Sequence, residues 1–301
     1  MMNALKLVQQ VCDELALFRP TALIGTADPQ VRQLMALLNR LGADITRQTE
    51  WQRLDKEYLV VTKAFSLTGT ITEGSKVITG LPTTTAITNQ FTVIGTGIQP
   101  FAQVVTVNNL TEITLDMKAE QSGTFEFQFA QNLYDLPADW QRQIPQTEWN
   151  RSQRWALLGP KSSQEWQTFK SGIVSAGPRQ RFRILNNQLA LNPSPPDGQT
   201  LSFEYISNGW VEGADGTAKT EVTADTDTFV FSDSLLITGL KSQWMVAKGL
   251  DASFSLGEFR YLLEQEKSTN KSAPTLSVGQ VMGSILLTEA NMIDGSWPGQ
   301  Q

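Results

Sequence analysis

Three acidic side chains are the residues of this sequence that could carry out a reaction: Glu126, Glu148 and Glu165. Glycoside hydrolysis needs two carboxyl groups roughly 5 to 10 Å apart in a cleft, one acting as acid and the other as base or nucleophile. Glu148 and Glu165 lie among tryptophans, whose flat apolar faces suit sugar rings. These residues define a carbohydrate-active or carbohydrate-binding alternative. The simpler interpretation, which we favour, is that each is a solvated strand or turn acid beside a structural tryptophan.

The composition excludes most other common chemistries. There is no His and only one Cys, which rules out Ser-His-Asp and Cys-His arrangements, an internal disulfide and any multi-Cys metal site. Cys12 lies in an apolar helical pattern and is expected to be a buried structural thiol. The sequence therefore predicts no catalytic residue, no metal ligand and no cofactor.

Two segments resemble ligand-binding loops but lack essential parts of them. Residues 213–220 approach a phosphate-binding loop, but Ala218 stands where that motif needs Gly, and neither a strand nor a helix flanks it correctly. We predict a surface turn there. Asp225 and Asp227 are spaced for a cation, yet the Gly and distal Glu of a calcium loop do not follow. A helix cap and a solvated loop are predicted instead.

Four of the eight tryptophans fall between residues 133 and 170. Such rings bury a large area and need a partner for each indole N–H, so their density predicts a packing centre or a protein–protein interface. Pro137, Pro145 and Pro160 divide the segment into short pieces, which favours a compact β region with tight turns. The four residues of this aromatic cluster are Trp140, Trp149, Trp155 and Trp166.

The chain of 301 residues is long enough for about two domains. Its net charge of −6 argues against tight binding of a nucleic-acid backbone over a large surface, which needs a concentrated basic patch. Polar residues interrupt the apolar pattern at the N-terminus, and no uncharged apolar run approaches the roughly 20 residues that span a bilayer. We expect a soluble cytoplasmic product with no membrane partner.

Helical periodicity marks the two ends of the sequence. Apolar residues recur at three- and four-residue steps within 3–19 and again after Asp28, the expected N-cap. Two further helices are predicted, one capped by Ser232 or Asp233 and one opening with Ser255 and Glu258 as a capping box. The second predicted helix has a narrow apolar seam that continues beyond it, formed by Val31, Leu34, Leu38, Leu41, Ile45, Trp51 and Leu54.

The middle of the sequence favours β structure. From about residue 66 to 130, short β-branched and aromatic runs alternate with Gly, Pro and Asn turns, which predicts a small sandwich or barrel. The strand 58–64 and the segment 133–140 would be continuous without it, so we interpret it as an insertion. Further on, Asn186-Asn187 predicts a hairpin turn and 200–206 a half-buried strand, followed by a polar loop over 209–227.

The predicted fold class is α+β. A helical bundle built from N- and C-terminal helices is combined with a central β region and an inserted small β-sandwich or barrel-like domain. We expect the main body at 1–65 and 131–270, the insert at 66–130 and an extended arm at 271–301. The arm is apolar without helical phase, so it either folds back on its own domain or docks on a neighbour. Its candidate anchors are Ile285, Leu286, Leu287, Met292 and Trp297.

Five segments of the sequence together carry a family resemblance. They are Ala-Asp-Pro-Gln-Val-Arg-Gln-Leu-Met-Ala-Leu-Leu-Asn-Arg at 27–40, Glu-Trp-Gln-Arg-Leu at 50–54, Leu-Pro-Ala-Asp-Trp at 136–140, Arg-Trp-Ala-Leu-Leu-Gly-Pro-Lys-Ser-Ser-Gln-Glu-Trp at 154–166 and Phe-Glu-Tyr-Ile-Ser-Asn-Gly-Trp at 203–210. These segments resemble the adaptor, or head-to-tail connector, proteins of tailed bacteriophages, especially short-tailed ones. The resemblance covers about 1–65 and 131–265. The Thr- and Gly-rich insert is similar to β modules of phage neck and tail proteins, and compact adaptors lack it.

This resemblance implies a structural virion protein of the neck or tail, assembled in the host cytoplasm and without enzymatic activity. Its copies would form a ring, commonly twelve-fold, between the portal protein and the tail nozzle. Double-stranded DNA would pass through the lumen without specific binding. The arm 271–301 would dock on the portal, and the insert would decorate the exterior.

Overall fold

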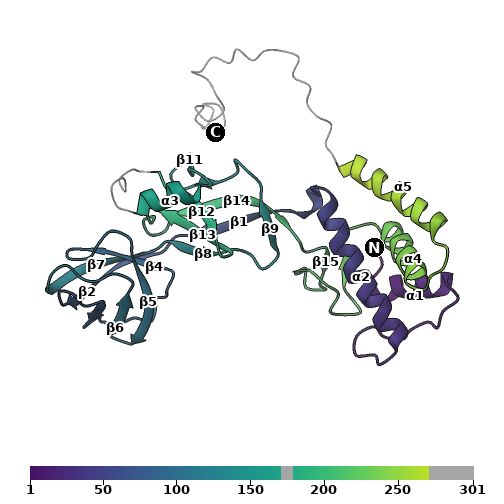
Figure 1. Ribbon diagram of the computed structural model, residues 1–301, viewed down its shortest axis with the longest axis horizontal. Helices are drawn as coiled ribbons and strands as arrows, with labels where there is room; N and C mark the ends of the chain where they lie inside the picture. Colours follow the sequence, from purple (N-terminus) through teal and green to yellow (C-terminus); the bar gives the residue numbers. More distant parts are fainter. Residues whose placement is uncertain (171–178, 271–301) are drawn as a thin grey trace, which may run out of the picture.

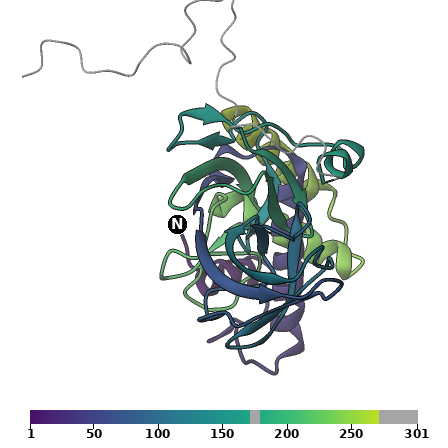
Figure 2. The same cartoon turned by 90° about the vertical axis from the view of Figure 1, so that its left-hand side faces the viewer.

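The computed structural model describes residues 1–170 and 179–270, which form three parts arranged along one axis (Figure 1). A helical unit lies at one end, a β-barrel lies at the other, and a central β region joins them. Viewed from the barrel end, the parts lie one behind another (Figure 2). The predicted α+β class is confirmed.

Five α-helices occur in the described residues, and most begin where the sequence supplies a cap. Asp28 caps α2 by accepting a hydrogen bond from the Gln30 N–H at 2.8 Å, as predicted, and Ser232 caps α4. Gly249, with φ of 71°, follows the end of α4. The helices are α1 (Ala4–Glu14), α2 (Pro29–Gln48), α3 (Ser163–Lys170), α4 (Asp233–Ala247) and α5 (Ser253–Asn270), with a short 3₁₀ turn at Gln52–Leu54.

Two helix boundaries were predicted wrongly, and one helix was missed. The first helix ends at Glu14 instead of continuing to residue 19, because Ala16 takes a positive φ of 52° and Phe18 turns out into solvent. Helix α5 begins two residues before the predicted capping box, with the Asp251 carboxylate accepting from the Ser253 N–H at 2.9 Å. Helix α3 was not predicted at all, although Ser162 and Glu165 form a capping box at its start.

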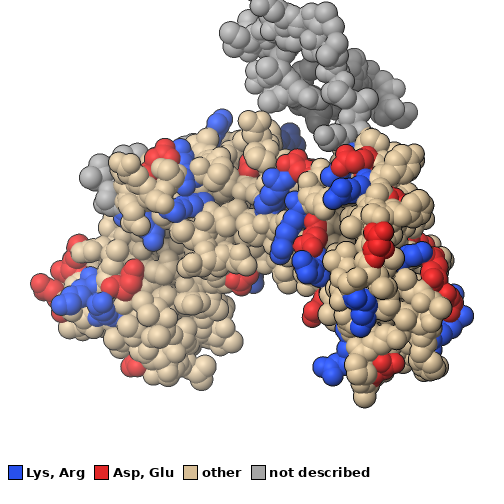
Figure 3. Space-filling view, turned by 45° about the vertical axis from the view of Figure 1, so that its right-hand side comes forward, with Lys and Arg blue, Asp and Glu red and all other residues tan. Residues whose placement is uncertain are grey.

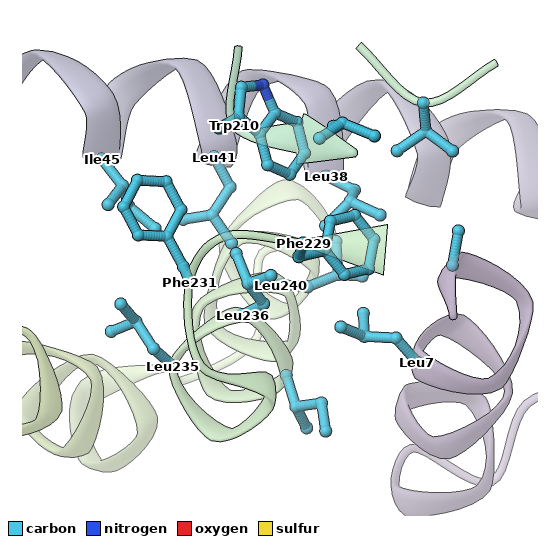
Figure 4. Packing of buried hydrophobic residues seen from close by; sticks show 14 of the residues in the cluster. Leu7, Leu38, Leu41, Ile45, Trp210, Phe229, Phe231, Leu235, Leu236 and Leu240 are labelled. Atoms are coloured by element: carbon cyan, nitrogen blue, oxygen red, sulfur yellow. The ribbon is translucent and has the colours of Figure 1, made fainter. Parts of the chain in front are cut away.

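The core of the helical unit contains more than helices. All five apolar residues of the α2 seam are buried, as are Trp51 and Leu54 beyond it. Trp210, Phe229 and Phe231 enter the same core from the chain between β14 and α4, and Figure 4 shows Phe229 and Phe231 pointing between the helices. The predicted polar loop over 209–227 is therefore wrong. It contributes to a three-stranded sheet of β15 (Val211–Glu212), β16 (Ala218–Lys219) and β17 (Thr228–Phe229).

The predicted small sandwich or barrel is a closed six-stranded barrel in the order β2-β3-β6-β5-β4-β7. The longest pairing joins β2 and β7 over eight residues, from Ala64 opposite Ala130 to Ile71 opposite Gly123. Phe127 and Phe129 of β7 alternate with exposed residues and fill the interior. Its strands are β2 (Ala64–Ile71), β3 (Val77–Thr79), β4 (Phe91–Gly95), β5 (Ala102–Asn109), β6 (Glu112–Leu115) and β7 (Gly123–Gln131).

The central β region is organised around β14 (Thr200–Ser207), which pairs with β1 (Asp55–Val61) over seven residues. Its other side pairs with β9 (Trp140–Gln143) and β10 (Trp149–Asn150), and β11 (Trp155–Ala156) follows β10. A second sheet has the order β12-β13-β8, with bounds Arg181–Leu185, Gln188–Asn192 and Leu133–Asp135. The predicted hairpin turn at Asn186-Asn187 is confirmed, with positive φ at both residues.

The two ends of the barrel segment lie side by side. The Gln131 N–H donates to the Lys63 carbonyl at 2.8 Å. The flanking strands β1 and β8 belong to different sheets. That 66–130 constitutes an independent domain stays a prediction.

Candidate functional site

The three candidate carboxylates belong to different elements. Glu126 lies on the outside of the barrel in β7, and Glu165 lies exposed in the first turn of α3. The Glu165 carboxylate accepts hydrogen bonds from the N–H and hydroxyl of Ser162, both at 3.1 Å, and these lower its pKa. It therefore acts as a helix cap. A low pKa keeps it ionised, unlike the raised pKa that a general acid requires.

The interpretation as a solvated acid is wrong for Glu148, because only 4% of its surface is exposed. Burial raises its pKa, and its carboxylate accepts a hydrogen bond from the Gln143 side chain. A raised pKa suits a general acid, but glycoside hydrolysis needs a second carboxyl group nearby. Glu126 lies on the barrel and Glu165 on α3, and no neighbouring carboxylate among the described residues contributes to the raised pKa of Glu148.

The aromatic cluster is spread over three strands and a helix. Trp140 lies on β9, Trp149 on β10, Trp155 on β11 and Trp166 on α3. Trp166 is buried, whereas 38% of Trp149 is exposed. Trp149 and Trp155 are on paired strands but directly oppose Ala156 and Asn150, so their side chains leave opposite faces of the sheet. Within the described residues, no two of the four rings stack on each other.

Three of these indoles combine burial with an unpaired donor. The Nε1 atoms of Trp140, Trp155 and Trp166 are buried and have no hydrogen-bond acceptor among the described atoms. An unpaired buried donor costs about 1 to 3 kcal/mol. Whether the cluster serves packing or an interface stays a prediction.

The ligand-like loops are structural. Residues 213–217 form the turn between β15 and β16, where the Asp215 carboxylate accepts from the Thr217 hydroxyl at 2.6 Å, and Ala218 and Lys219 belong to β16. The Asp225 carboxylate accepts from the N–H groups of Leu23 and Ile24, both at 3.1 Å. Both carboxylates are thus engaged within the chain. The predicted helix cap and solvated loop at Asp225 and Asp227 are wrong, because Asp225 binds N–H groups outside any helix and Asp227 is buried.

Asp227 is fully buried and holds the same loop together. Its carboxylate accepts from the ammonium of Lys219 at 2.9 Å and from the N–H groups of Thr223 and Ala224 at 2.8 and 2.9 Å. Burial opposes its ionisation, but these hydrogen bonds outweigh that effect and lower its pKa.

Within the described residues, no group of three or more acidic, His or Cys side chains could hold a metal ion. Cys12 is fully buried, and burial raises the pKa of its thiol.

A polar network that the sequence did not reveal is centred on Asp139. Its carboxylate accepts from the Lys56 ammonium at 2.7 Å, the Ser207 hydroxyl at 2.7 Å and the Tyr205 hydroxyl at 3.0 Å. Burial opposes ionisation of Asp139, but the three hydrogen bonds together lower its pKa. The network ties the segment before β9 to both β1 and β14. It is a structural clamp at the junction of the central β region and the helical unit.

The outer surface of the helical unit carries large apolar side chains in solvent. On α5, 86% of Phe254 and 69% of Tyr261 are exposed. Val246 at the end of α4 and Leu250 in the following turn are also more than half exposed. We call these four residues the apolar corner. Exposed apolar side chains of this size are candidates for an interaction surface.

The outward face of α2 has a different character. Arg32, Ala36, Arg40, Ala43 and Arg47 follow each other at three- and four-residue steps, which places them on one face. The three arginines and Ala36 are exposed and Ala43 is half-buried. We call these five residues the arginine face. Elsewhere the charges are mixed, and Figure 3 shows Lys and Arg interspersed with Asp and Glu on the visible side.

A cavity of about 290 Å³ lies between the barrel and the loop before β14. Its lining comes from β4, from the turn before β5 and from Pro193 and Ser194. The lining is mainly apolar and contains no carboxylate. None of the candidate acids or tryptophans lines it.

The five candidate portal anchors, Ile285, Leu286, Leu287, Met292 and Trp297, lie outside the described residues. In the described part of the chain, no helix is both long and apolar enough to cross a membrane. Comparison of the chain with known protein families and with curated proteins finds no match.

Proposed function

We propose that this protein is a head-to-tail adaptor of a tailed bacteriophage, a structural component that joins the portal to the tail nozzle. Its copies form a ring, commonly of twelve, around a channel through which double-stranded DNA passes. The helices α1, α2, α4 and α5 act as the bundle from which the ring is built. The barrel faces outward.

The single observation that best supports assembly is the apolar corner. Phe254 and Tyr261 are largely in solvent in the isolated chain, although each ring would bury roughly 150 to 250 Å² in an interface. Burying each ring in an interface would contribute about 2 kcal/mol or more of hydrophobic free energy. Exposed rings of this kind are expected in a protein that binds neighbouring subunits.

The distribution of charge is compatible with a DNA channel. Tight binding of a phosphate backbone would need a concentrated basic surface, and the net charge is −6. Acidic and basic side chains are mixed on the surface seen in Figure 3. DNA could then move past such a ring without being held.

The portal contact is assigned to residues 271–301, which follow directly on α5. The Asn270 side chain accepts from the Gln52 N–H at 2.9 Å and donates to the Glu50 carbonyl at 2.6 Å, so the last residue of α5 is fixed to the segment that follows α2. The apolar anchors of the arm would occupy grooves on the portal.

Deleting 271–301 tests this assignment. We expect the shortened chain to keep the circular dichroism spectrum and melting temperature of the full chain, and to lose attachment to purified portal rings in a sedimentation assay. A variant with Ser replacing Ile285, Leu286 and Leu287 should weaken attachment in the same direction. Unchanged attachment of the shortened chain would reject the arm, and failure of the full chain to attach would reject the adaptor function.

One observation favours a second candidate, a carbohydrate-active tail protein. Glu148 is buried with a raised pKa, as a general acid would be. Hydrolysis of capsular or cell-wall glycans that disappears on Glu148→Gln, with the fold intact, would support this function. The adaptor proposal expects no such activity.

A further inference from the structure

The apolar corner and the arginine face match each other in spacing. On α5, Phe254, Glu258 and Tyr261 stand at i, i+4 and i+7, so the two rings are about 10 Å apart along the helix. On α2, Ala36, Arg40 and Ala43 repeat the same spacing. Two large side chains flank an acid on one helix, and two small ones flank a base on the other.

We propose that α5 of one copy docks on the arginine face of α2 in a second copy. Phe254 and Tyr261 occupy the depressions left by Ala36 and Ala43, as knobs fill holes between packed helices. The central Glu258 then meets the central Arg40. Because both patterns are nearly symmetric about their charged residue, this pairing is available in either relative direction of the helices.

The surroundings of both faces strengthen the match. No side chain crowds the space beside Gly257, so a partner helix can approach α5 closely between its two rings. The arginines of α2 can cover aromatic faces while their charges meet Glu258. Arg40 is available for this contact, since its side chain is 75% exposed and its own partner Asp44 lies 3.7 Å away. An exposed ion pair such as Arg40–Asp44 adds little to the stability of the fold, so breaking it costs little.

The two faces cannot meet within one chain. Helix α4 lies between α2 and α5 (Figure 1). At Gly239 of α4 an added Cβ would lie 2.8 Å from Leu41 and 2.9 Å from Phe259, so the three helices are packed closely there. The outward faces of α2 and α5 therefore point away from α4 on different sides. The contact uses two different surfaces, so each copy keeps one of each free for the next neighbour.

Such a head-to-tail contact either closes into a ring or continues as a filament. Closure into a ring is the part of this inference that rests on the proposed function. The contact itself rests only on the spacing, exposure and charge of the two helices.

A charge exchange between Glu258 and Arg40 tests the contact in the full-length chain. Sedimentation velocity over a concentration series should show self-association of the wild type, weakened about tenfold or more in Glu258→Arg and in Arg40→Glu, because each places like charges opposite each other. Mixing the two variants should restore association. The arginine introduced in one variant then faces the glutamate introduced in the other at one contact, and the unchanged Glu258 and Arg40 face each other at the next.

Glu73→Arg, an exposed change on the barrel, is the matched control and should associate like the wild type. Circular dichroism checks that each variant is folded. A monomeric wild type, or charge variants that associate normally, would overturn the contact. So would association that appears only after 271–301 is removed, since that segment would then cover the face. Attachment to portal rings is measured in a separate assay. Failure to attach would reject the adaptor function but would leave the contact between α5 and α2 supported.

Discussion

At the scale of residues, the acidic side chains divide by what surrounds them. Asp139 and Asp227 are ionised groups held by several donors, and Glu165 caps a helix. Glu148 alone combines burial with a raised pKa. Most acids that sequence inspection would offer for catalysis or metal binding are therefore committed to holding the fold.

Asp139→Asn is expected to lower the free energy of unfolding by about 2 to 3 kcal/mol near neutral pH, because Lys56 loses its counter-charge and two hydroxyls lose a charged acceptor. The folded-state pKa of Asp139 is lowered, so its contribution is complete above the unfolded value of about 3.9 and is lost as pH falls through the folded value. Urea unfolding at several pH values should show the gap between wild type and variant closing in acid.

The matched control is Asp44→Asn, which removes only an exposed carboxylate 3.7 Å from Arg40. It should change the free energy of unfolding by less than about 1 kcal/mol. Equal losses for Asp44→Asn and Asp139→Asn would show that the Asp139 network does not act as a clamp.

The Asp139 network could not have been predicted from the sequence. Its donors Lys56, Tyr205 and Ser207 lie 83, 66 and 68 positions away along the chain. Only the folding of β14 between β1 and β9 brings them to one carboxylate. In contrast, the Asp28 cap and the turn at Asn186-Asn187 depend on a few neighbouring residues, and both were predicted correctly.

At the scale of elements, periodicity predicted those that bury one continuous face. The α2 seam is of this kind. The strand at β14 was predicted correctly, but it is not half-buried as expected, because consecutive residues on both of its faces are covered. The predictions failed where contacts between residues far apart in the sequence determine the structure. The segment between β14 and α4 was predicted as a polar loop, but its residues Trp210, Phe229 and Phe231 are buried in the core of the helical unit. The apolar corner could not be predicted either, because the sequence does not show which face of α5 the rest of the chain covers.

Gly42 of α2 leaves the space that the Trp210 ring occupies. A Cβ at Gly42 would lie 2.2 Å from the Trp210 ring, so Gly42→Ala should force the ring out of place and destabilise the protein by about 1 to 3 kcal/mol. Helix propensity alone would predict that Gly42→Ala stabilises the protein.

Gly257→Ala on α5 has open space around it and should stabilise the protein by about 0.5 to 1 kcal/mol.

Thermal unfolding of both variants at low protein concentration, where self-association is negligible, separates the two effects. The tryptophan fluorescence of Gly42→Ala should also change, because Trp210 is fully buried against Phe229 in the parent. Stabilisation by both substitutions would contradict the packing described for Trp210.

At the scale of the whole molecule, the barrel has the features of an autonomous unit. Its apolar core is separate from the other two cores. Its contacts with the central β region include polar ones, such as the Thr92 hydroxyl 2.7 Å from that of Ser194 and the Gln90 amide 2.8 Å from Asp135. Closure of the sheet leaves no unpaired edge.

We therefore expect residues 63–132, expressed alone, to unfold in a single cooperative transition followed by circular dichroism. The reciprocal chain, with 64–131 replaced by a short Gly-Ser linker, should keep the helical signal, because Lys63 and Gln131 are already hydrogen-bonded neighbours. Phe127→Ala should abolish or strongly weaken the isolated barrel, at a cost of about 3 to 5 kcal/mol. A fragment without a transition would show that the barrel depends on the rest of the chain.

The ladder between β1 and β14 has a mechanical consequence. Strand β1 is the covalent link from the 3₁₀ turn after α2 to the first barrel strand, so tension between helices and barrel would run along its length. The strand is already extended, so its covalent backbone has little length left to give, and its seven residue pairs with β14 hold it straight. The connection should thus behave as a stiff strut, able to carry a pull from one end of the molecule to the other without lengthening.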